Sequence, residues 1–144
     1  MRSRPEDGFT LLEVLAVVAV MALALALVVP AVGAGGGASA LAADGRALLA
    51  AARLARQQAI LEEREVVLTL DLERRRWSLP GAGGDLSGRV ALTVTADAAE
   101  TGAGAAAVRF LPDGGSTGAE VVLAAGEARR TLRIDWLTGH ATLR

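Results

Sequence analysis

An apolar run extends from Leu11 to Val32, and Glu13 carries its one ionisable side chain. At the helical rise of about 1.5 Å per residue, a run of this length reaches about 33 Å, enough to cross the hydrocarbon core of a bilayer. We therefore predict a transmembrane helix over residues 9–32. This segment constrains the fold, because everything after it belongs to a domain tethered at its N-terminus.

A short charged leader, residues 1–8, precedes the run. A secretory signal peptide has its cleavage site after the apolar stretch, whereas Gly8 lies before it. Cleavage after Gly8 would leave the apolar helix attached to the mature protein. Arg2 and Arg4 are the only basic residues before Arg46, so the positive-inside rule places the leader in the cytoplasm and the C-terminal domain across the membrane.

Glu13 is the unusual residue of the run. A carboxylate near the bilayer core costs at least a few kcal/mol unless it is paired, protonated or close to the interface. Cleavage after Gly8 would create an amine on Phe9, one helical turn before Glu13, and we expect this amine, on the same or a neighbouring chain, to pair with the carboxylate. The alternative is that Glu13 lies at the headgroup level and has no role.

The junction resembles the class III signal of type IV prepilins and type II secretion pseudopilins. The residues that carry the resemblance are Gly8-Phe9-Thr10-Leu11-Leu12-Glu13-Val14. The resemblance implies cleavage after Gly8 and N-methylation of Phe9 by an inner-membrane prepilin peptidase. It also implies extraction from the membrane into a helical filament, in which Glu13 helps to set the register.

A Gly-rich break and an amphipathic helical stem are predicted over residues 33–65. Pro30 removes a helical hydrogen bond and the glycines that follow weaken the helix, so a kink or local unwinding is expected there. Beyond them, leucine and alanine side chains fall on one helical stripe, which we expect to pack on a sheet. The stripe consists of Leu41, Leu48, Ala52, Ala55 and Ala59.

From Val66 the apolar period changes from helical to two, which predicts a β-rich head over residues 66–144. In the last long strand, Leu132, Ile134 and Trp136 alternate with Thr131, Arg133 and Asp135, and a short final strand is expected to point Ala141 and Leu143 inward. The predicted strands lie near 66–72, 77–79, 90–94, 107–111, 119–125, 131–136 and 141–143, with loops at 80–88, 97–105 and 112–118.

The C-terminal half resembles the GspH/FimT pseudopilin domain. The matching residues are Phe110-Leu111-Pro112-Asp113-Gly114, Ser116-Thr117-Gly118, Ile134-Asp135 and Thr138-Gly139. The resemblance implies an α+β, type IV pilin-like fold, in which a long N-terminal helix leads into a head of two antiparallel sheets.

No catalytic, cofactor or metal site is predicted. Cysteine is absent, and the single histidine, His140, is expected on the surface, without a second histidine or cysteine for a metal. The loop at 112–118 lacks the Gly-Lys-Ser/Thr ending of a phosphate-binding loop, and Asp113 is expected to cap its own turn. The sequence therefore argues against an enzyme.

The resemblances imply a structural subunit: a minor pseudopilin of a type II secretion system, at or near the tip of a periplasmic pseudopilus that helps to export folded proteins. Its expected partners are the other minor pseudopilins, the major pseudopilin, the prepilin peptidase/methyltransferase and, at the tip, secreted exoproteins. It would be a single-pass protein of the bacterial inner membrane with a periplasmic head.

Two alternatives remain. The first is a FimT/FimU-like minor pilin of a type IV pilus, which shares the same domain. The second is a DNA-binding pilin, for which four arginines near the C-terminus would supply a basic patch. These are Arg129, Arg130, Arg133 and Arg144. The formal net charge of −1 and the acidic Glu127 and Asp135 nearby argue against nucleic acid.

Overall fold

The computed structural model describes residues 11–96, 101–102 and 104–144, with the backbone alone for 25–35 and 101–102. The chain divides into two compact units, residues 1–36 and 37–144. The predicted leader and Phe9 lie outside the described residues. Within the part of the chain that the structure describes, no helix is long and apolar enough to cross a membrane. The predicted span, 9–32, reaches beyond that part at residues 9–10 and at the side chains of 25–32.

One helix, α1 (Leu11–Leu61), accounts for all of the helical structure among the described residues. It continues through Pro30 and through the glycines that follow, so the backbone is not unwound there, whereas the expected kink stays a prediction. A proline removes one backbone donor, but the residues on both sides keep their own hydrogen bonds, and cooperative helix formation continues across the gap.

Helix α1 ends four residues before the predicted boundary at residue 65. The amide of Glu62 still donates to the carbonyl oxygen of Gln58 at 2.9 Å, and Glu63 then adopts a φ of 49°. A residue in the left-handed region cannot continue a right-handed helix, so the chain turns there and enters the first strand.

Nine strands follow among the described residues and form two antiparallel sheets, as predicted. The first sheet has the order β3-β2-β1-β6-β5, and the second has the order β4-β7-β8-β9. The strands are β1 (Val66–Asp71), β2 (Arg76–Leu79), β3 (Ala82–Asp85), β4 (Ala91–Ala96), β5 (Thr101–Gly102), β6 (Ala105–Phe110), β7 (Ala119–Ala125), β8 (Ala128–Ile134) and β9 (Ala141–Leu143).

Strand β3 corrects the loop predicted at 80–88. Its glycines looked like loop residues, but Gly84 pairs with Trp77 across the β2–β3 hairpin. A Cβ added to Gly84 would lie 2.9 Å from Nε1 of Trp77, so the indole lies directly over the glycine. The missing side chain makes room for the ring, which supplies the packing that a glycine strand lacks. The predicted loop 97–105 also contains the two residues of β5.

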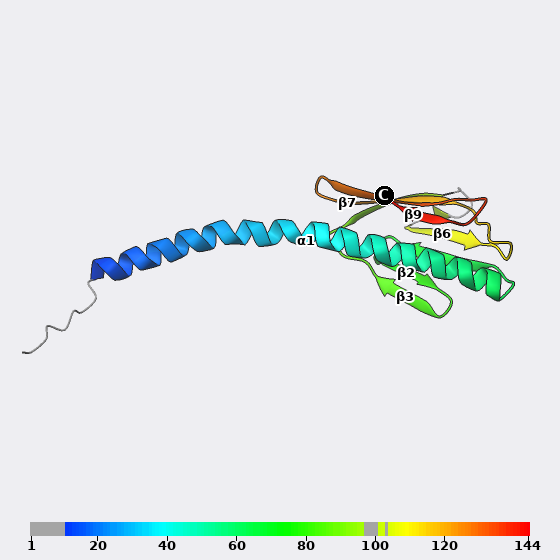
Figure 1. The fold of residues 1–144 in the computed structure, drawn as a ribbon, viewed down its shortest axis with the longest axis horizontal. Coiled ribbons are helices and arrows are strands. Elements are labelled where there is room, and N and C mark those ends of the chain that lie inside the picture. Colours follow the sequence, from blue (N-terminus) through cyan, green and yellow to red (C-terminus); the bar gives the residue numbers. More distant parts are fainter. Residues whose placement is uncertain (1–10, 97–100, 103) are drawn as a thin grey trace, which may run out of the picture. The chain divides into compact units, whose positions relative to one another are not determined.

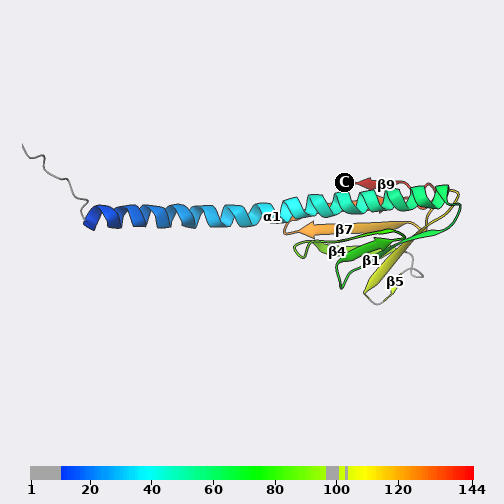
Figure 2. The ribbon, with the colours of Figure 1, turned by 90° about the horizontal axis from the view of Figure 1, so that it is seen from below.

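A single core joins α1 to both sheets in the second unit. The predicted stripe of the stem is confirmed, because each of its five side chains is at most 3% exposed. Figures 1 and 2 show this part of α1 running along the strands. Opposite the stripe lie buried side chains of the first sheet, such as Val66 and Phe110, and of the second, such as Val121 and Leu132.

Leu48→Ala should destabilise the head by about 2–5 kcal/mol, because it removes a fully buried side chain and leaves a cavity between the sheets. Leu54→Ala is the matched control on the same helix. Leu54 is 38% exposed, so its truncation should cost less than about 1 kcal/mol. Urea denaturation of the detergent-solubilised full chain, followed by tryptophan fluorescence, measures both values. Equal losses would contradict the assigned helix face.

Candidate functional site

The predicted processing residues, Gly8 and Phe9, lie outside the described residues, whereas Glu13 lies in the first turn of α1. Its side chain is exposed and borders a shallow groove of about 290 Å³. A carboxylate in the first helical turn interacts favourably with the positive end of the helix dipole. The other residues along the groove are apolar: Ala16, Val17, Val20 and Met21.

Apart from Glu13, the first turns of α1 carry apolar side chains on all sides. Nine large side chains between residues 11 and 23 are at least 50% exposed, and they point in every direction around the helix. A helix with this character is typically buried, in a large protein or in a membrane. The side chains are Leu11, Leu12, Val14, Leu15, Val17, Val18, Val20, Met21 and Leu23.

In the second unit, the β8–β9 connection is a turn stapled by Asp135. Its Oδ1 accepts hydrogen bonds from the amides of Leu137 and Thr138 at 3.1 and 2.9 Å and from the Thr138 hydroxyl at 2.9 Å. The backbone bond from Thr138 is the largest cause that lowers the pKa of Asp135 below 3.8, and the Thr138 hydroxyl and the nearby charge of Arg133 act in the same direction.

Arg56 joins the end of α1 to two loops of the head. Its Nε donates to the carbonyl oxygens of Gly114 and Thr138, at 3.1 and 2.8 Å. Gly139 has a φ of 61°, and a side chain there would collide with the Gly114 carbonyl oxygen. Close packing and the Arg56 bonds therefore fix the loop at 112–118 against the 135–139 turn. Asp113 caps its own turn as predicted, accepting from the Gly115 amide at 2.9 Å.

The stapled turn exposes two large apolar side chains, Trp136 and Leu137, which are 67% and 66% exposed. The alternation predicted for Leu132, Ile134 and Trp136 therefore ends at Ile134. Strand β8 ends at Ile134 because the Asp135 carboxylate bonds the following amides and turns the chain out of the ladder. The Asp-Trp-Leu-Thr-Gly segment is a turn signal that overrides the alternation of apolar residues.

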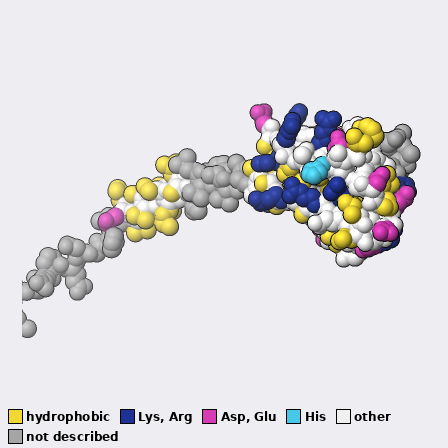
Figure 3. All heavy atoms as spheres, turned by 45° about the vertical axis from the view of Figure 1, so that its right-hand side comes forward, with side chains coloured by type: hydrophobic (Ala, Val, Ile, Leu, Met, Phe, Trp, Pro, Cys, Tyr) yellow, Lys and Arg dark blue, Asp and Glu magenta, His cyan; other side chains and the backbone are white. Residues whose placement is uncertain are grey.

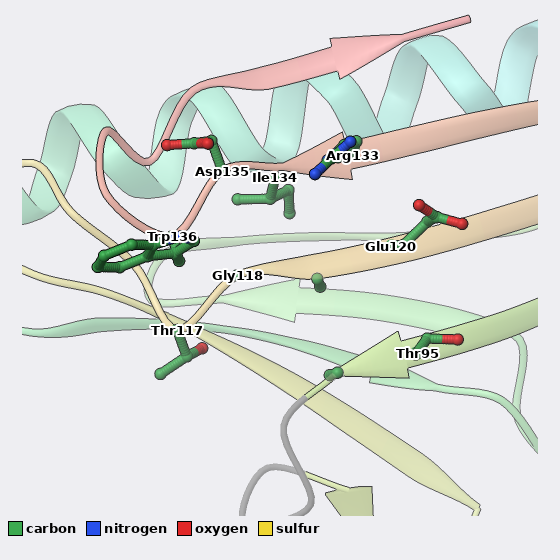
Figure 4. A pocket seen from close by; sticks show the side chains of 10 residues that line it. Thr95, Thr117, Gly118, Glu120, Arg133, Ile134, Asp135 and Trp136 are labelled. Atoms are coloured by element: carbon green, nitrogen blue, oxygen red, sulfur yellow. The ribbon is translucent and has the colours of Figure 1, made fainter.

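A pocket of about 390 Å³ lies beside Trp136, across the ends of β4, β7 and β8. Figure 4 shows the indole at one end of the pocket and polar side chains along the sheet. Arg133 and Glu120 are opposite one another in the β7–β8 ladder, yet they form no ion pair among the described residues. The lining side chains include Thr95, Thr117, Glu120, Arg133, Asp135 and Trp136.

The four arginines of the predicted basic patch are all exposed. Strand β8 carries Arg129, Arg130 and Arg133, and backbone hydrogen bonds with Thr131, of 2.8 and 3.0 Å, bring Arg144 alongside. Figure 3 shows arginine side chains gathered on one face of the second unit. None of the four forms an ion pair in the described part of the chain.

His140 is exposed, as predicted, and lies beside Arg53 and Arg56 in a pocket of about 240 Å³. Among the described residues, no group of three or more histidine, aspartate or glutamate side chains is placed to hold a metal ion. The described residues instead present two exposed apolar features: the first turns of α1, and the turn that carries Trp136 and Leu137.

Comparisons with known proteins match two parts of the chain. Residues 44–139 match the family described as type II transport protein GspH, and residues 3–29 match the prokaryotic N-terminal methylation motif. A relative, the type II secretion system protein H of Xanthomonas campestris pv. campestris, is 34% identical over 135 residues, which cover 92% of this chain and 80% of the relative.

Two solved structures share the fold. The type IV minor pilin FimU of Pseudomonas aeruginosa matches with a TM-score of 0.59 and 14% identity, over 72% of this chain and 87% of that chain. The minor pseudopilin EpsH from the type 2 secretion system of Vibrio cholerae matches with a TM-score of 0.55 and 14% identity, over 72% and 94% of the two chains. These likenesses confirm the pilin-like fold.

The staple at Asp135 makes stability depend on pH in a defined direction. The pKa of Asp135 is lowered in the folded state. The stabilisation is therefore complete above about pH 3.8, the ordinary pKa, and it is lost as the pH falls through the lowered pKa. Asp135→Asn should therefore lower the melting temperature at neutral pH, and the gap from the wild type should close at strongly acidic pH. Glu127→Gln is the control, because Glu127 is exposed. A gap that does not change with pH would contradict a charged staple.

Proposed function

The chain belongs to the GspH family of type II transport proteins, and from this premise we propose that it is a minor pseudopilin of a type II secretion system. Its role is structural: it forms part of a periplasmic pseudopilus that helps to export folded proteins across the outer membrane. The observation that carries the proposal is that the methylation motif and the GspH domain occur on one chain, in this order.

The two units present different surfaces, and both support a subunit that assembles with other molecules. The first turns of α1 expose apolar side chains all round, and these require lipid or other helices as neighbours. The second unit instead has its own buried core and presents a rigid, partly apolar turn.

We further propose that a prepilin peptidase cleaves the chain after Gly8 and methylates the new N-terminus at Phe9. The apolar helix, residues 9–32, then anchors the protein in the inner membrane with its head in the periplasm until it enters the filament. Glu13, in the first turn of α1, pairs with the amine of a terminal Phe9 within the filament core. Such a pair removes the cost of a lone carboxylate in an apolar environment.

At or near the tip of the pseudopilus, the head would contact other minor pseudopilins, the major pseudopilin and exported proteins. The alternative is a minor pilin of a type IV pilus, which the likeness to FimU keeps open, because that likeness concerns the fold. The relative from Xanthomonas campestris favours secretion, since it is named as a secretion protein and covers most of the chain.

Processing gives the first test of this proposal. The mature protein should lack residues 1–8 and carry one additional methyl group, as read by intact mass. Gly8→Asp should remain uncleaved, because the resemblance to the class III signal implies a glycine before the bond. Glu13→Val is the matched variant within the same motif and should still be cleaved. An uncleaved wild-type chain would contradict every pilin-like role.

Loss of the gene gives the second test. Folded exoproteins should accumulate in the periplasm while pili and twitching remain normal. The wild-type chain should restore secretion, whereas Glu13→Val should be processed and yet fail to restore it, because the filament register is lost. Normal secretion with lost pili would instead assign the protein to a type IV pilus. Full complementation by Glu13→Val would remove the pairing role of that carboxylate.

A further inference from the structure

One face of the second unit carries exposed arginines that come from α1, β8 and β9. None of them forms an ion pair with a described residue. The ion pairs of the described residues lie instead on the first sheet, in its turns and in the segment after α1. Positive charge is therefore paired there and unpaired on this face, which Figure 3 shows in part. The arginine face consists of Arg46, Arg53, Arg129, Arg133 and Arg144.

Strand pairing places two of these arginines beside one groove. On β8, Arg133 is exposed between the buried Leu132 and Ile134, so its side chain points away from the core. Backbone hydrogen bonds of 2.8 and 3.0 Å between Thr131 and Arg144 bring the end of β9 alongside β8. Arg133 and Arg144 both line a groove of about 150 Å³, so two guanidinium groups border it. Its other lining residues are Glu120, Thr131 and Thr142.

Helix α1 continues the face beyond β9. A Cβ added to Gly45 would lie 3.1 Å from Cδ2 of Leu143, so the helix lies against the strand, as Figures 1 and 2 show. Arg46 and Arg53 are both exposed and lie about two helical turns apart, on the same side of the helix. Arg53 shares a pocket with His140, the residue before β9. The positive charge therefore extends from the sheet onto the helix.

The pocket beside Arg53, of about 240 Å³, suits an anionic group. No carboxylate lies among its described lining residues. Arg56 is held in its wall because the Nε donates to two backbone carbonyl oxygens, while the terminal nitrogens form no hydrogen bond with the described residues. A guanidinium group that is already fixed loses less entropy when it binds an anion. The lining residues are Arg53, Arg56, Gln57, Gly139, His140 and Ala141.

The carboxylates near this face favour a polypeptide over a nucleic acid as its occupant. Glu120 lies opposite Arg133 in the β7–β8 ladder, and the exposed Glu127 lies in the turn before β8. A DNA duplex presents about one charge per 1.7 Å of its axis, and both carboxylates would repel such a continuous row of phosphates. A polypeptide can instead place carboxylates at the arginines and a hydrogen-bond donor at Glu120.

We propose that the arginine face binds an acidic segment of another protein. One carboxylate of this segment enters the pocket, where Arg53 and Arg56 hold it, and further carboxylates pair with Arg133 and Arg144 along β8 and β9. Guanidinium groups bind carboxylates through two parallel hydrogen bonds, so the face selects Asp and Glu side chains at a matching spacing.

Fluorescence anisotropy of the detergent-solubilised full chain tests the proposal. The probe is a labelled peptide in which glutamate alternates with glycine, and the same peptide with glutamine is the uncharged control. Arg53→Gln alters the pocket and Arg144→Gln alters the groove. Arg89→Gln is the matched control, because Arg89 is also exposed and forms no ion pair with a described residue. It precedes β4, at the opposite edge of the sheet from β9.

The glutamate peptide should bind, and the glutamine peptide should not. Arg53→Gln should weaken binding about tenfold, the loss expected for one charge-assisted hydrogen bond. Arg144→Gln should weaken it about threefold, because its pair is more exposed, and Arg89→Gln by less than about twofold. All three melting temperatures should stay unchanged, since the replaced side chains are exposed. No binding of the glutamate peptide, or equal losses in all three variants, would overturn the proposal.

Competitors distinguish the other anionic occupants. A short DNA duplex or a short-chain phosphatidylglycerol, added at the same concentration of negative charge, should displace the labelled peptide less effectively than the unlabelled peptide does. Stronger displacement by the duplex would assign the face to nucleic acid, and stronger displacement by the lipid would assign it to a membrane surface. Either result would overturn the proposal. Because binding is measured without secretion, the proposed function stands or fails separately.

Discussion

The head depends on the burial of one face of α1 between two sheets. The face is narrow and rich in alanine, and Ala52, Ala55 and Ala59 have no exposed surface. Alanine side chains end at Cβ, and Leu48 is the one large side chain of this face that is completely buried. Each sheet then covers its own apolar face against the same helix, so neither would have a complete core without it.

Beyond this core, polar contacts fix the loops at one end of the head. Arg56 lies on the same helix but reaches past the core to the carbonyl oxygens of two loops, at Gly114 and Thr138. Asp135 fixes the second of these loops from within. The result is a rigid turn that holds Trp136 in solvent. A backbone segment that is already fixed loses little entropy on binding, which suits this turn to an interface.

Strands and helix faces with a regular apolar period were predictable from the sequence. The alternation in Val66, Leu68 and Leu70 matched the buried face of β1, and the helical stripe matched the buried face of α1. Strand β3 was missed because its evidence lies elsewhere in the chain: Gly84 is a strand residue on account of the Trp77 ring above it. Helix α1 continues through Pro30 and the glycines that follow, although their local propensity favours unwinding.

The sequence by itself determined the order of the protein: a processing motif, an apolar helix, an amphipathic continuation and a β-rich head of the GspH type. These are properties of neighbouring residues, because periodicity and short motifs act within a few helical turns or one strand. Only the tertiary structure decided that Trp136 faces solvent, that Arg133 and Glu120 lie together without an ion pair, and that β4 is the outermost strand of the second sheet. Each of these depends on which distant segments meet, and such meetings are set by the packing of the whole head.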